Sequence, residues 1–163
     1  MNLRKPSKPK SLFFFAFFIT LGLMACRYTY TIEINGDTRI PGLTTSSKVV
    51  ADVPATTQWY PSGLVVKEGD TLVIQYVSGV WSPWPGGNYD ALGSGGDPRC
   101  TCNVILGVSH AALIAKIGNN QPFFVGNEFR HRVGERGMVY LGINDNHLSD
   151  NSGSLIVKLE ALR

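Results

Sequence analysis

The chain has 163 residues, of which 44% are hydrophobic and 17% charged, and its formal net charge is +3. Four of its 15 basic residues lie within the first 26 positions, which hold no acidic residue, so residues 27–163 carry 11 basic and 12 acidic side chains. The basic excess therefore belongs to the N-terminal segment and does not indicate a nucleic-acid partner. Residues 27–163 are enough for one domain with a hydrophobic core.

The N-terminal segment has the pattern of an export signal. Four basic residues at positions 4–10 precede an apolar run, Leu12–Ala25, that is short for a membrane-spanning helix. The run ends at Leu23-Met24-Ala25-Cys26, which resembles the lipobox of bacterial lipoproteins. This resemblance implies that residues 1–25 are a lipoprotein signal peptide and that Cys26 is diacylated, which anchors the protein to a membrane of the cell envelope.

Two alternatives stay open for this segment: cleavage without lipidation, and an uncleaved anchor. The residue after the cysteine is Arg27, not the Asp that retains many lipoproteins at the inner membrane. An outer-membrane lipoprotein is therefore favoured.

Short segments of β-strand pattern follow one another along the rest of the chain, with no convincing helical period and no internal repeat. Residues 26–57 are expected to be an N-terminal strand and a linker, and residues 58–163 the main domain. The Gly-containing turn at residues 67–70 predicts a hairpin, and residues 83–102 predict a long irregular loop. Seven or eight short strands at this spacing indicate an all-β fold, a β-sandwich or jelly roll. Strands are predicted at Arg27–Asp37, around Lys48–Val53, and at Leu64–Val66, Thr71–Val77, Ala111–Ile117, Pro122–Gly126, Glu128–Val133, Val139–Ile143 and Gly153–Glu160.

Cys100 and Cys102 are the only cysteines after Cys26. Export permits a disulfide, although a bridge across one intervening residue is constrained. Two thiols or a local disulfide are favoured over redox chemistry. A zinc site is disfavoured because the sequence places neither another cysteine nor a histidine close by.

The loop at residues 144–151 concentrates oxygen-bearing side chains between two predicted buried strands. Asp145, Asp150 and Asn151 offer carboxylate and amide oxygens, the ligands that calcium prefers. The spacing does not fit an EF-hand, and calcium takes six to eight oxygens, so a neighbouring loop would have to contribute. The alternative is a polar connecting turn, since Asn, Asp and Ser are common in any tight loop.

Five segments in order resemble the PA-I type galactophilic lectins of bacteria, a family of small calcium-dependent jelly rolls with galactose-binding-like β-sandwich architecture. The likeness covers residues 59–159. The segments are Gly63–Asp70, Ser78–Trp81, Ala112–Gly118, Phe124–Asn127 and Leu141–Ser154.

The resemblance implies a calcium site made by Asp145, the adjacent pair Asp150 and Asn151, a carbonyl near Leu148, and a carbonyl from Ser82, Pro83 or Trp84, of which Pro83 is the chosen candidate. This loop is shorter than in the galactose binders, and Asp150 stands where they have an amide. The His and Gln that contact galactose are missing from the aligned residues 97–102. The resemblance therefore extends to calcium and not to galactose specificity.

The function expected from the sequence is a lipid-anchored, calcium-dependent carbohydrate-binding module, with a carbohydrate or glycoconjugate as partner and no oligomeric state predicted. Its ligand contacts would come from Asp145, His147, Asn151 and Trp84. The alternative is a structural or accessory β-sandwich domain that binds no sugar. An enzyme is not expected, because the three histidines are scattered and no catalytic motif is present.

Overall fold

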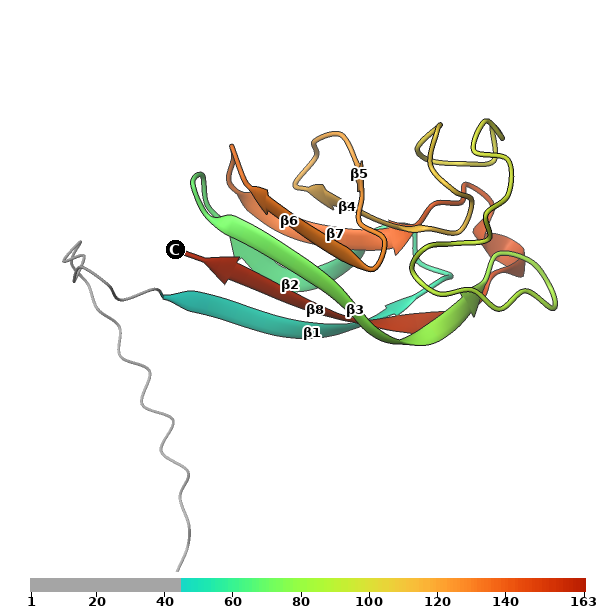
Figure 1. The fold of residues 1–163 in the computed structure, drawn as a ribbon, viewed down its shortest axis with the longest axis horizontal. Coiled ribbons are helices and arrows are strands. Elements are labelled where there is room, and N and C mark those ends of the chain that lie inside the picture. The colour runs from blue at the N-terminus through green and yellow to red at the C-terminus, as the bar shows by residue number, and fades with distance from the viewer. Residues whose placement is uncertain (1–44) are drawn as a thin grey trace, which may run out of the picture. The chain divides into compact units, whose positions relative to one another are not determined.

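The computed structural model describes residues 45–163, which form two antiparallel four-stranded sheets packed face to face (Figure 1). The strand order is β1-β8-β3-β6 in the first sheet and β2-β7-β4-β5 in the second. This arrangement confirms the predicted all-β sandwich. The elements are β1 (Ser46–Pro54), β2 (Tyr60–Val66), β3 (Thr71–Ser82), β4 (Leu113–Ile117), β5 (Phe123–Phe124), β6 (Glu128–Arg132), β7 (Gly137–Ile143), the 3-10 turn η1 (Leu148–Asp150) and β8 (Ser152–Leu162).

Several expectations from the sequence fall on residues outside the described part of the chain. These are the signal peptide at residues 1–25, the lipidation of Cys26 and the strand at Arg27–Asp37. Within residues 45–163, no helix is both long enough and apolar enough to cross a membrane.

The core lies between the two sheets and follows the alternation of the strands. In β8 every second residue from Leu155 to Ala161 is fully buried, and the residues between them are partly exposed. Val139, Leu141 and Ile143 of β7 face them from the second sheet and are equally buried. Each of the buried Val, Leu and Ile side chains among them stabilises the fold by roughly 1.5–3 kcal/mol relative to an exposed one.

A strand is present in each range predicted from residue 48 onward, although β4 begins at Leu113 and not at Ala111, and β5 is only two residues long. The predicted hairpin at residues 67–70 is wrong. The turn itself is present, with Gly69 at φ 86° and the Asp70 N–H bonded to the Lys67 carbonyl at 3.1 Å. The strands on its two sides pair with different neighbours, however, because β2 belongs to the second sheet and β3 to the first. The turn therefore carries the chain from one sheet to the other.

β1 is an integral strand of the sandwich. It lies within the range expected to be an N-terminal strand and linker, yet it pairs with β8 along its whole length, from Ser46 opposite Leu162 to Pro54 opposite Ser154. Its inward residues Ala51 and Val53 are buried in the common core. The first sheet therefore begins well before residue 58.

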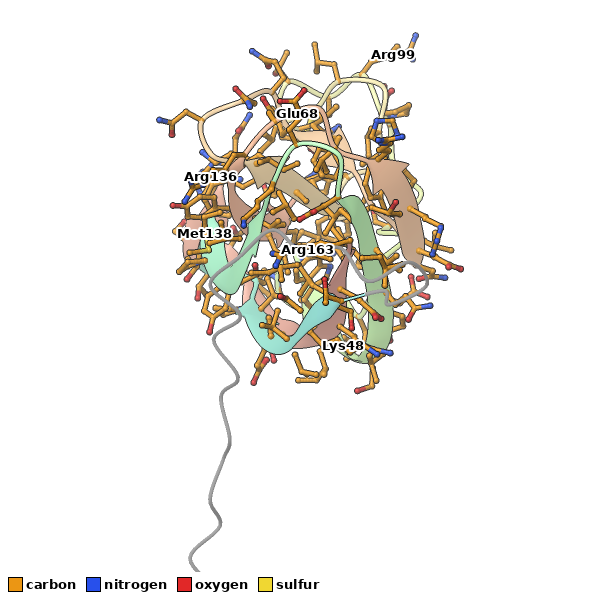
Figure 2. The ribbon with its side chains drawn as sticks, turned by 90° about the vertical axis from the view of Figure 1, so that its left-hand side faces the viewer. Lys48, Glu68, Arg99, Arg136, Met138 and Arg163 are labelled. Carbon is orange, nitrogen blue, oxygen red and sulfur yellow. A yellow bond between two sulfur atoms is a disulfide. The ribbon has the colours of Figure 1, made fainter. Side chains whose placement is uncertain are left out.

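The two ends of the sandwich differ in character. One end carries the long loop between β3 and β4 together with η1, on the right of Figure 1. The other end carries the β2–β3 turn and Arg163, and Figure 2 views the molecule from that side. There the Arg163 guanidinium lies 3.3 Å from the nearly buried carboxylate of Asp70.

Candidate cation and ligand site

Strand register brings the candidate loop at residues 144–151 beside both ends of the long loop. Ser82 at the end of β3 pairs with Ser152 at the start of β8, so Pro83 follows on next to Asn151. On the other side the Asn144 N–H donates to the Ala112 carbonyl at 2.8 Å, extending the pairing of β7 with β4. Segments far apart in the sequence therefore meet at one end of the sandwich.

Asp145 and Asn151 each present a buried oxygen that has no hydrogen-bond partner. Asp145 is 2% exposed and Asn151 is 7% exposed. Asp145 Oδ1 accepts the His147 N–H at 2.8 Å, and Asn151 Nδ2 donates to the Ala55 carbonyl at 3.2 Å. Asp145 Oδ2 and Asn151 Oδ1 receive nothing, and in residues 45–163 they are the only buried side-chain N or O atoms in this condition.

Buried polar atoms in folded proteins are nearly always paired, and an unpaired one costs free energy. A carboxylate oxygen and an amide oxygen are both hard ligands that calcium accepts. The residues present therefore fit a cation of this kind. Among residues 45–163, no three His, Cys, Asp or Glu side chains cluster as a metal site, so backbone and amide oxygens would have to complete it.

The other residues expected to hold the metal differ in burial and in how far their oxygens are already hydrogen-bonded. The Leu148 carbonyl lies in η1 and accepts the Asn151 N–H at 3.3 Å. Pro83 is buried beside the start of β8, whereas Asp150 is exposed at the end of η1. The adjacent pair Asp150 and Asn151 is thus split between the surface and the interior. The Trp84 carbonyl is already bonded to Ser82 Oγ and to the Gly87 N–H.

Asn144 and Asn146 join the candidate loop to the long loop, a role that was not predicted from the sequence. Asn144 is fully buried; its Oδ1 accepts the Ile105 N–H at 2.7 Å and its Nδ2 donates to three carbonyls of residues 105–109. The Asn146 N–H donates to the Cys102 carbonyl at 2.7 Å. The sequence contains one sign of this role: an asparagine stands on each side of Asp145, and an amide side chain can donate and accept hydrogen bonds at once, as a link between two loops requires.

Trp84, expected to contact the ligand, is 39% exposed and belongs to an aromatic cluster. Its ring stacks on that of His110, with centroids 5.5 Å apart and an interplanar angle of 1°. Tyr89 meets Trp84 edge-on at 5.5 Å. His147, the other expected contact, is exposed, and its Nε2 lies 2.9 Å from Ser149 Oγ in the same loop.

Trp81 is a core residue near the end of β3, and it fixes the long loop against this strand. Its Nε1–H donates to the Ala111 carbonyl at 2.8 Å. Ala111 adopts φ 62°, a left-handed conformation that costs a non-glycine residue about 1–2 kcal/mol. The Ala111 N–H donates to the Asn144 carbonyl at 3.2 Å, so this strained residue connects the core to the candidate loop.

Cys100 and Cys102 are joined by a disulfide in the long loop. No histidine was expected near them from the sequence, but the fold brings His110 Nδ1 to 3.6 Å from Cys102 Sγ. Nearby, Asp97 and Arg99 form an ion pair at the surface, and hydrogen bonds from Arg99 lower the pKa of the Asp97 carboxyl. Arg99 is labelled at the periphery of Figure 2.

No protein-family model matches the chain, and a search of curated proteins gives no match. Among solved structures, the chain is similar to one titled "EclA N-terminal domain; PllA-like lectin", with a TM-score of 0.55 and 23% sequence identity. The match covers 69% of this chain and 95% of that one. At this level of identity the similarity shows a shared lectin-like fold.

Proposed function

We propose that the β-sandwich is a calcium-dependent carbohydrate-binding module. The observation that carries the proposal is the pair of buried, unpartnered oxygens, Asp145 Oδ2 and Asn151 Oδ1. A bound calcium ion would satisfy both of them and neutralise the buried carboxylate. The Leu148 and Pro83 carbonyls and the Asp150 carboxylate are the further ligands proposed, and sugar hydroxyls would complete the coordination.

The aromatic cluster supports a sugar as the ligand. Sugars present C–H faces that pack against aromatic rings, and Trp84 keeps part of its surface open while His110 holds it from one side. Side-chain oxygens of Asp145 and Asn151 and the exposed His147 would orient the sugar hydroxyls. The solved structure with the similar fold is titled a lectin, which agrees with this assignment.

A glycan array tests the proposal most directly. We expect the protein to bind a subset of glycans in calcium, to lose this binding in EDTA, and to lose it on Asp145→Ala. Asp52→Ala is the matched control, because Asp52 is exposed on β1 and should leave binding unchanged. Silence across neutral and anionic glycans in calcium would instead indicate a structural or accessory domain that binds no sugar.

We also propose that the domain is displayed on the cell envelope, exported by residues 1–25 and anchored through an acylated Cys26. The support is the sequence pattern alone. Labelling cells with a palmitate analogue should mark the wild-type protein and fail to mark Cys26→Ser. Labelling that survives this substitution would contradict the anchor.

A further inference from the structure

The Cys100–Cys102 disulfide lies where external thiols can reach it. The bridge spans one residue, Thr101, which is exposed, and both cysteines are themselves partly exposed. A bridge across one residue has little freedom to reach relaxed geometry. Exposed or constrained disulfides are opened by thiols more readily than buried structural ones.

Each sulfur has an N–H group beside it: the Cys102 N–H donates to Cys100 Sγ at 3.2 Å within the bridge itself, and His110 supplies a side-chain donor on the side of Cys102 Sγ. Asn103 Nδ2 donates to the Asp97 and Pro98 carbonyls at 3.4 and 3.3 Å, which turns Asn103 Oδ1 toward His110 Nδ1 at 2.8 Å. Because an amide oxygen only accepts, His110 Nδ1 carries the hydrogen. The same Nδ1 lies 3.6 Å from Cys102 Sγ, so the one hydrogen that Asn103 Oδ1 accepts while the bridge is closed can be shared with a thiolate formed on Cys102, which it would stabilise.

We propose that the Cys100–Cys102 disulfide is a redox site opened by low-molecular-weight thiols and closed again by their disulfides, with Cys102 as the leaving group in the opening step. An external thiolate attacks Cys100 Sγ, the bond between the two protein sulfurs breaks, and the electron pair stays on Cys102 Sγ, where His110 Nδ1–H donates to it. A second external thiolate then attacks the external sulfur of the mixed disulfide, the bond from that sulfur to Cys100 Sγ breaks, and Cys100 leaves as a thiolate; the two protein thiolates take up protons from solvent. Two thiols are thereby oxidised to one disulfide, and the protein gains two protons and two electrons.

The bridge is also linked to the candidate loop, because the carbonyls of residues 101–103 accept hydrogen bonds from Asn146. The Cys102 carbonyl accepts the Asn146 N–H at 2.7 Å, and the Thr101 and Asn103 carbonyls accept Asn146 Nδ2 at 3.3 and 2.9 Å. Asn146 follows Asp145 directly. Opening the bridge should loosen the three carbonyls that hold Asn146. The effect of this loosening on ligand affinity rests on the proposed function, whereas the opening of the bridge by thiols does not.

The redox step is tested on the full chain in buffers of reduced and oxidised glutathione, with alkylation and mass analysis of the peptide that contains Cys100 and Cys102. We expect millimolar reduced glutathione to open the bridge without denaturant. His110→Phe keeps a ring against Trp84 but removes the donor, so the bridge should open about tenfold more slowly and its midpoint potential should fall by about 30 mV, the two-electron equivalent of tenfold. His131→Phe, on β6, is the matched control.

A bridge that stays closed in wild-type protein under excess reduced glutathione overturns the proposal, whether or not the variants fold. Equal opening rates for His110→Phe and wild type, both with cooperative melts, overturn the role of His110. The link to the candidate loop is read from amide hydrogen exchange at Asn146, which should speed up in the double variant Cys100→Ser, Cys102→Ser. Unchanged protection there overturns the link. None of these measurements uses calcium or sugar.

Discussion

The two carboxylate oxygens of Asp145 are in different situations when no cation is bound. One carboxylate oxygen is paired with the His147 N–H and shapes the loop, while the other is buried without a donor. A buried carboxylate oxygen that lacks a partner destabilises the fold, so if Asp145 holds calcium as proposed, it should lower the stability of the protein when calcium is removed.

We therefore predict opposite effects of Asp145→Asn with and without calcium. Asparagine keeps an oxygen for the His147 N–H but removes the buried charge, so in EDTA the variant should melt at or above the wild-type temperature. Calcium at 100 times its dissociation constant should stabilise the wild type by about 2.7 kcal/mol and leave the variant unchanged. Thermal melts in EDTA and in calcium measure both effects.

Asp52→Asn makes the same charge change at an exposed position of β1 and should behave as wild type in both conditions. A wild-type melting temperature that is the same in EDTA and in calcium would remove the metal site. A variant that still responds to calcium would remove Asp145 from it.

At the scale of elements, a bulge in β3 decides which residues reach the core. The pairing of β3 with β8 shifts between Tyr76 and Ser78, so Val77 is an extra residue. Ile74 faces the core before the shift, and Trp81, an odd number of positions later, faces it afterwards. Val77 and Val80 are turned to solvent, at 56% and 46% exposed. A strict alternation along β3 would have placed Trp81 outside.

Any side chain at Gly79, just after this bulge, is predicted to destabilise the fold. The φ of Gly79 is 95°, and a Cβ there would overlap the Ser154 carbonyl oxygen of β8. Gly79→Ala should therefore combine the cost of a left-handed alanine, about 1–2 kcal/mol, with that of an overpacked strand pair, about 1–3 kcal/mol. Denaturant unfolding measures the sum.

Gly63 of β2 offers the matched control, because its φ of 82° is similar and, apart from its chain neighbours, no residue lies within 4 Å of the position of its Cβ. Gly63→Ala should show the conformational cost alone. Equal losses of stability in the two variants would mean that the approach of β8 to Gly79 is unimportant.

The strands themselves can be predicted from the sequence, but the way they pair cannot. Alternating apolar residues identify β7 and β8, and an apolar run between turn residues identifies β4, because burial on one or both faces leaves a local pattern. The choice of pairing partner leaves no such local pattern. The sequence of the turn at residues 67–70 is compatible both with two strands that pair with each other and with two strands that belong to different sheets. Asp145 and Asn151 could be singled out by ligand chemistry, whereas His110 could not, since its contact with Cys102 arises only from the path of the long loop.

At the scale of the whole molecule, the proposed binding site and a partly buried ion pair that stabilises the fold lie at opposite ends of the sandwich. The end opposite the candidate site is held by Asp70, whose carboxylate accepts the Lys67 N–H at 2.9 Å and lies 3.3 Å from Arg163 Nε. The Asp70 carbonyl also accepts the Val133 N–H at 2.8 Å. One nearly buried residue thus ties together the crossing from β2 to β3, the segment after β6 and Arg163.

Asp70→Ala should therefore weaken the fold without changing the response to calcium. Removing a buried charged acceptor leaves the Lys67 N–H and the Arg163 guanidinium without it, which costs about 1.5–3 kcal/mol in denaturant unfolding. Arg163→Ala should cost less, about 1 kcal/mol or below, because that side chain is partly exposed and Asp70 keeps the Lys67 N–H. The calcium-dependent gain in stability should persist in both variants, since Asp145 lies at the other end. If Asp70→Ala abolished that gain while the domain remained folded, the two ends would be coupled through the sandwich and this prediction would be wrong.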